Sequence, residues 1–162
     1  MLTDEQIEHL LQTPKVVTNP KARTKDQRKS TQTTYALESE CGTHRFELYA
    51  RQNSIDPDHY SCGLIYHHPC GERIHLTRYN GSNHDHRNPL EGGELIRFKC
   101  HIHRATQRYI EIGDKAEKFA VTTDRYSDLS GALHCLIMDC CISGLHTSPP
   151  YSTDDGSQLS LI

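Results

Sequence analysis

The most constraining feature of this sequence is the regular alternation of apolar and polar side chains over residues 44–52. Phe46, Leu48 and Ala50 occupy every second position, and charged or tyrosine side chains occupy the positions between them. Successive side chains of a strand point to opposite faces, so this pattern predicts a strand with one buried and one solvated face. Such a strand is expected to belong to an antiparallel sheet that is covered on one side.

Three further strands are expected after this one. Residues 60–67 and 72–79 predict the next two, and the segment between them contains Pro69 and Gly71, which are typical of a reversal. Residues 94–103 predict a fourth strand, whose alternation puts basic and histidine side chains on the face away from the core.

Helices are expected before and after these strands. Residues 3–12 have a helical apolar stripe that ends before Pro14, and residues 105–112 change to a helical period. The last helix is expected to begin at Ser127, followed by a long apolar stripe. The predicted fold class is therefore α+β, with a four-stranded antiparallel sheet, an N-terminal helix and two C-terminal helices.

The chain is expected to form one domain over residues 1–142. Residues 143–162 have the composition of a disordered tail. Residues 13–43 lack periodicity and predict a basic flexible arm, which either follows phosphate backbones or is a solvated connector. Within this arm, residues 15–29 contain one acidic residue, Asp26, and six basic residues, Lys15, Lys21, Arg23, Lys25, Arg28 and Lys29.

Composition and charge narrow the class of protein. No apolar run approaches the ~18 residues of a membrane span, and the acidic start predicts no secretory signal. A cytoplasmic protein is therefore expected, in which the seven cysteines are thiols rather than disulfides. The net charge of −3 argues against a broad electrostatic grip on nucleic acid, so any such grip has to be local.

The residues most suited to chemistry lie within residues 78–104. His84 and His86 precede a polar, glycine-containing connection, and His101 and His103 follow it. Side chains two residues apart on a strand share a face, and a hairpin would bring the other pair beside them. Four imidazoles on one face suit either metal ligation or phosphate and proton-transfer chemistry.

Zinc binding is the first hypothesis for this cluster. Zinc takes three or four nitrogen or sulfur ligands, at about 2.0–2.3 Å, in a tetrahedron. Neighbouring carboxylates would complete an open site. The candidate ligands are His84, His86, His101 and His103, with Asp85, Glu91 and Glu94 as the nearby carboxylates.

Metal-free RNA cleavage is the second hypothesis. It needs a base for the 2′-hydroxyl, an acid for the leaving 5′-oxygen and cations for the phosphate. His101 and His103 are the candidate base and acid, and Arg78, Tyr79 and Arg104 complete the candidate catalytic set. The candidate nucleic-acid-binding residues are Arg97, Lys99, Asn80, Asn88 and Tyr109.

A binding module without chemistry is the third hypothesis. Such a protein would use a zinc-fixed loop as an interaction surface and act as an inhibitor of a host or phage-defence protein. The acidic balance and short length of the chain suit this interpretation. The protein partner expected under these hypotheses is an antitoxin or a host target.

Two motifs carry a resemblance to a known family. RYNG-x-x-H-x-H-x-N at residues 78–88 and HIHRAT-x-RY at residues 101–109 resemble an uncharacterised bacterial domain family of small proteins near mobile elements. The resemblance covers about residues 1–142 and implies no activity. The order of elements is also similar to that of small toxin ribonucleases, which is an analogy of fold only. The expected function is that of a small RNA-directed protein of this ribonuclease type.

Overall fold

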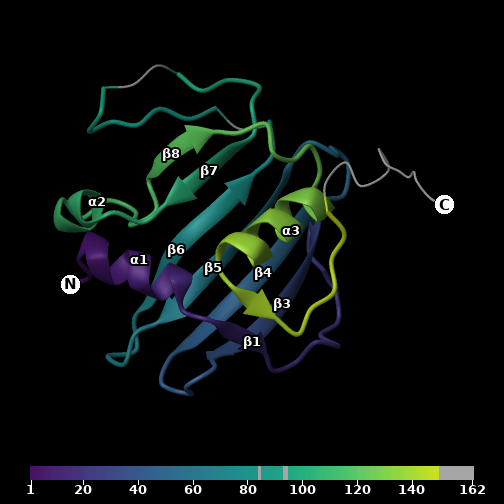
Figure 1. Ribbon diagram of the computed structural model, residues 1–162. Coiled ribbons are helices and arrows are strands. Elements are labelled where there is room, and N and C mark those ends of the chain that lie inside the picture. The colour runs from purple at the N-terminus through teal and green to yellow at the C-terminus, as the bar shows by residue number, and fades with distance from the viewer. Residues whose placement is uncertain (84, 93–94, 150–162) are drawn as a thin grey trace.

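The computed structural model describes residues 1–83, 85–92 and 95–149, which form an α+β fold around one large mixed sheet (Figure 1). Eight strands follow one another across this sheet, and β2 (Lys25–Asp26) pairs with one of them beside that path. In spatial order the eight are β8 (Phe119–Thr122), β7 (His101–Arg104), β6 (Arg73–Asn80), β5 (Tyr60–His67), β4 (Arg45–Asn53), β3 (Ser30–Ser39), β1 (Lys15–Val17) and β9 (Ile142–Ser143).

The expectation of a four-stranded sheet was wrong. Residues 13–43, expected to be a flexible arm, contribute β1, β2 and β3. The β3 strand pairs with β4 along nine residues, from Ser30 opposite Asn53 to Glu38 opposite Arg45. Its threonine-rich sequence lacks a clear apolar alternation, and seven of its ten residues are partly buried or exposed. Pairing with β4, rather than a local apolar pattern, therefore holds β3 in the sheet.

The predicted fourth strand is also shorter than expected. In the described part of this segment, residues 95–104, only β7 is a strand, and Ile96 makes a single bridge to His86. Phe98 has φ +57°, a left-handed conformation that interrupts an extended chain. The sheet instead gains β8, which pairs with β7 from a stretch that showed no strand pattern.

Three helices complete the described fold: α1 (Asp4–Gln12), α2 (Gln107–Glu111) and α3 (Leu129–Asp139). Helix α1 begins with a capping box, in which the Thr3 and Gln6 side chains each bond the other residue's backbone. Helix α3 is capped by Asp128, one residue later than expected. None of the described helices is long and apolar enough to cross a bilayer.

The apolar core lies between the sheet and helices α1 and α3, which cover the same face (Figure 1). Ile7 of α1 and Leu136 of α3 are fully buried there, against strand residues such as Leu48 and Leu64. The opposite face of the sheet carries polar side chains. Residues that pair across neighbouring strands share a face of the sheet. On this face the pairing forms two adjacent rows, Arg51, Ser61, Asn80 and His101 in the first and Tyr49, Gly63, Arg78 and His103 in the second.

A long connection over residues 81–100 joins β6 to β7 and lies at the β8 edge of the sheet (Figure 1). Gly81 begins it, and a Cβ there would lie 2.3 Å from the backbone oxygen of Asp58. Asn88 bonds both backbone groups of Ala120 in β8: its Nδ2 donates to the carbonyl (2.7 Å) and its Oδ1 accepts from the amide (2.8 Å). The connection is thereby anchored to the edge strand.

Candidate functional site

Three imidazoles meet on the polar face of the sheet. His101 and His103 project from β7, with ring centroids 5.0 Å apart. His86, from the 81–100 connection, lies 5.9 Å from His101 and 4.7 Å from His103. The structure thus brings together three of the four histidines singled out in the sequence, and His84 lies outside the described residues.

Backbone carbonyls set the tautomers of the two strand histidines. Nδ1 of His103 lies 2.9 Å from the backbone oxygen of Glu117, and Nδ1 of His101 lies 3.0 Å from that of Lys99. A carbonyl oxygen only accepts, so each Nδ1 carries the proton and donates it. In the neutral rings Nε2 is then the basic atom, and Nε2 of His101 lies 3.4 Å from Nδ2 of Asn80.

His103 is held in its neutral form. Its side chain is almost fully buried, and burial lowers its pKa from 6.5 to about 3. The positive charge of Arg78 and the neighbouring His101 and His86 contribute to this lowering of the pKa. Near neutral pH, His103 is therefore uncharged, and Nε2 has a lone pair that can accept a hydrogen bond.

Asn88 orients His86. Its Oδ1 accepts from the amide of Ala120 and lies 2.9 Å from Nε2 of His86, so Nε2 is the protonated nitrogen of that ring. Asn88 was expected to bind nucleic acid, but its described contacts are those of a residue that organises the loop. It holds His86 over the two strand histidines.

The three histidines border an open cavity of about 550 Å³ on the polar face. Hydroxyl and amide side chains line its floor, among them Ser61 and Asn80. Among the described lining residues, cations outnumber carboxylates by five to one. The cations are Lys29, Arg51, Arg78, Lys115 and Lys118, and the carboxylate is Asp85. The cavity therefore favours an anionic ligand.

Two buried polar atoms at this cavity lack a hydrogen-bond partner among the described residues. They are Nε of Arg78 and Oδ1 of Asn80. Nη1 of Arg78 lies 3.3 Å from the buried carboxylate of Glu117, which fixes the guanidinium in place. A buried polar atom left unpaired costs about 1–3 kcal/mol, so both atoms are suited to contact a polar ligand or water.

A family model covers nearly all of this architecture. It matches residues 2–141, from the start of α1 to just after α3, and is described as a family of unknown function (DUF6978). The chain belongs to this family. Comparison with curated proteins and with solved structures found no match. Membership of DUF6978 implies no activity, and the function depends on the chemistry of the site.

Two of the predicted catalytic residues of this DUF6978 protein lie on the other face of the sheet. Tyr79 is buried against α3, and its hydroxyl donates to Asp139. Arg104 forms an ion pair with Glu8 of α1. The alternation of side chains along a strand explains both positions. In β6, Tyr79 faces away from Arg78 and Asn80, and in β7, Arg104 faces away from His101 and His103. The structure does not bring these two residues to the cavity.

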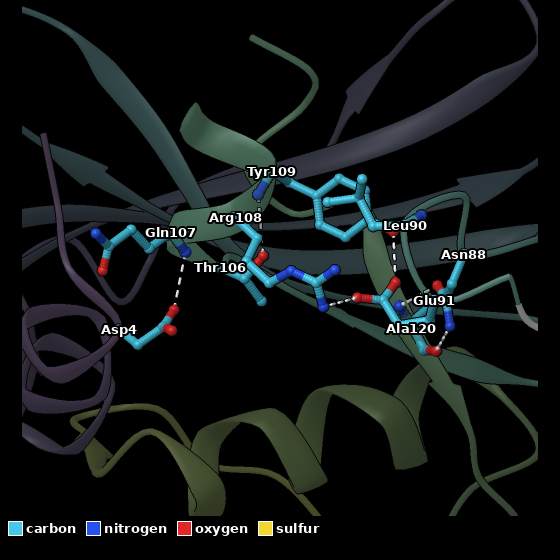
Figure 2. A network of polar contacts seen from close by, with 9 residues as sticks. All are labelled: Asp4, Asn88, Leu90, Glu91, Thr106, Gln107, Arg108, Tyr109 and Ala120. Carbon is cyan, nitrogen blue, oxygen red and sulfur yellow. Dashed lines mark hydrogen bonds and ion pairs between the residues drawn. The ribbon is translucent and has the colours of Figure 1, made fainter. Parts of the chain in front are cut away.

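The other predicted nucleic-acid contacts are dispersed. Arg97 is exposed and pairs with Asp85, with Nε and Oδ2 3.4 Å apart. Lys99 is exposed beside the site. Tyr109 is fully buried, and its hydroxyl donates to Glu91 (2.6 Å), so its ring is not available to stack on a base (Figure 2).

Sequence reasoning missed several residues of the cavity. Arg51 had a detectable signal, because it lies on the solvated parity of the strand at 44–52. Lys29, Lys115 and Lys118 come from segments without periodicity, so only the folded chain places them here. Glu117 likewise reaches Arg78 from a turn before β8.

Within the described residues no group of three or more His, Cys, Asp or Glu side chains is arranged to hold a metal ion. Of the predicted zinc ligands and their carboxylate neighbours, His84 and Glu94 lie outside those residues. Glu91 is committed to Tyr109 and Arg108. Zinc binding at this cluster therefore stays a prediction.

Proposed function

We propose that this protein binds RNA on the polar face of its sheet and cleaves a phosphodiester bond in the cavity beside His86, His101 and His103. The observation that carries the proposal is the unpartnered, buried Nε of Arg78, which lies beside a neutral histidine in a cation-rich cavity. A phosphate group would satisfy the guanidinium and the surrounding positive charge together.

Recognition of the phosphate rests on Arg78. Glu117 holds one end of its guanidinium, so this side chain can bind a phosphate with little further loss of side-chain freedom. Lys115 and Lys118 line the same cavity and add positive charge where the pentacoordinate phosphate would form. Binding thus strengthens as negative charge develops on the phosphate, which lowers the barrier to cleavage.

Proton transfer rests on the imidazoles. The negative charge of the bound phosphate raises the low pKa of His103. Nε2 of His103 then accepts the proton of the 2′-hydroxyl, whose oxygen attacks the adjacent phosphorus. The bond from phosphorus to the 5′-oxygen breaks as a neighbouring imidazolium, that of His86 or His101, donates a proton to that oxygen and becomes a neutral imidazole. The products are a 2′,3′-cyclic phosphate and a 5′-hydroxyl. The nucleophile belongs to the substrate, which is why RNA and not DNA is the proposed substrate.

The test is cleavage of a labelled single-stranded RNA, compared with DNA of the same sequence. His103→Gln removes the base, and we expect a loss of roughly 10²–10⁴-fold in rate. His146→Gln is the matched control, because His146 is exposed outside the cavity and its loss should leave the rate unchanged. A folded His103→Gln protein with the wild-type rate, or a wild type that neither binds nor cleaves RNA, would contradict the proposal.

A second candidate function is that of a zinc-stabilised binding or inhibitor module without catalysis. One observation favours it: Nδ1 of His101 and of His103 each donates to a backbone carbonyl, as metal-binding histidines usually do. The ligands would be His84, His86, His101 and His103, and the 81–100 connection would then contact a protein partner. About one zinc per chain, lost in His101→Ala and His103→Ala, would favour this function.

A further inference from the structure

The basic segment over residues 21–29 is built into the sheet beside the cavity. Its strand β2 pairs with the start of β3, with Lys25 opposite Gln32 and Asp26 opposite Thr31. The amide of Gln27 donates to the carbonyl of Ser30 (2.7 Å), which closes the turn between the two strands. These bonds give the positive charges of the segment defined positions on the surface.

The turn of this segment reaches the rim of the cavity. Lys29 and Ser30 both line it, and Nε of Arg51 donates to Oγ of Ser30 (3.0 Å). The amide of Ser54 donates to the carbonyl of Lys29 (2.9 Å), which ties the turn to the end of β4. The cavity and the basic segment therefore form one continuous surface.

The positive charges of this segment are exposed and unpaired. None of its five cations forms an ion pair within the described residues. In contrast, Arg73, Arg104 and Arg125, on other parts of the surface, each pair with a carboxylate. The segment contains one carboxylate, Asp26, and its cations are Lys21, Arg23, Lys25, Arg28 and Lys29.

We propose that the ligand is a single-stranded RNA of several nucleotides, with one phosphate in the cavity and its backbone continuing over residues 21–29. This inference rests on the proposed function and goes beyond it, because it names the length class of the substrate. Unpaired cations in a row beside a phosphate site match the repeated charges of a polynucleotide, and not the single charge of a nucleotide.

The test compares binding of a trinucleotide with that of a single-stranded RNA of about ten nucleotides, a length within the range of single-strand sites. For the wild type we expect about tenfold tighter binding of the longer RNA and a steeper salt dependence. In the double variant Arg23→Gln/Arg28→Gln the salt slope for the longer RNA should fall by about 1.4, since each single-strand phosphate contact contributes about 0.7. Binding of the trinucleotide should not change.

The matched control is Arg45→Gln/Arg73→Gln, which removes the same charge. Arg45 begins β4 and Arg73 begins β6, and neither residue lines the cavity. It should bind both RNAs as the wild type does. Equal affinity for the two lengths, or an unchanged slope in the Arg23/Arg28 variant, would overturn the inference and leave the proposed function intact. Preference for a duplex of the same length would overturn the single-strand assignment. A wild type that binds neither RNA would overturn both proposals.

Discussion

Lys15 is a basic residue with no exposed surface. Its ammonium donates to three backbone carbonyls, those of Leu11 (3.0 Å), Thr13 (2.7 Å) and Cys140 (2.9 Å). These oxygens lie at the C-terminal ends of α1 and α3, where helix carbonyls lack partners and a positive charge is favoured. One side chain thus joins both covering helices to the start of β1.

We expect Lys15→Met to lower the free energy of unfolding by about 2–4 kcal/mol, because three carbonyls lose their donor. Burial lowers the pKa of Lys15 from 10.5 to about 8. Between pH 8 and pH 10.5, Lys15 is protonated in the unfolded chain and has lost its proton in the folded chain. The free energy of unfolding of the wild type therefore rises with pH in this range. The deficit of the variant should therefore grow above pH 8. Urea denaturation measures both effects, with Lys21→Met as the exposed control; an unchanged midpoint would refute this role.

At the scale of elements, a polar clamp fastens the 81–100 connection to helix α2 (Figure 2). Glu91 accepts from Tyr109 (2.6 Å) and from Arg108 (3.0 Å) of α2, and the amide of Leu90 donates to the same tyrosine hydroxyl (3.0 Å). Asp4 of α1 in turn accepts from the amide that begins α2 (2.8 Å). The clamp therefore links the segment that carries His86 to both helices.

We expect Glu91→Ala to loosen this connection without unfolding the chain. The loss of a hydrogen-bonded charge should lower the free energy of local opening by about 1.5 kcal/mol. The amide of His86, which donates to the carbonyl of Ile96, should then exchange its hydrogen roughly tenfold faster. RNA cleavage should fall as His86 leaves its place beside His103. Glu111→Ala is the control, since Glu111 is an exposed α2 carboxylate bonded only to Gln107 in the described structure. Unchanged exchange at His86 would exclude a clamp.

At the scale of the whole molecule, both long helices pack on one face of the sheet and leave the other face to the cavity. If zinc is bound at the histidine cluster, its binding energy becomes folding energy of the entire chain. The binding-module hypothesis therefore predicts that a chelator lowers the melting temperature by about ten degrees or more. The ribonuclease hypothesis predicts an unchanged melting curve, and calorimetry with and without chelator distinguishes the two.

The sequence by itself determined the elements whose own pattern is strong. The alternation at 44–52, the stripe at 3–12 and the parity of His101 and His103 were all sufficient, because burial on one face imposes a local period. It also determined which residue types are available for chemistry.

Only the tertiary structure decided the size of the sheet and the membership of the site. Strand β3 depends on its pairing with β4, and β8 on its pairing with β7, so neither shows an apolar pattern of its own. Tyr79 and Arg104 are close to the histidines in sequence, but the alternation of side chains puts both on the face that the helices cover. Strand pairing brings Arg51 to the cavity instead. Long-range pairing is a property of the folded chain, which no local period records.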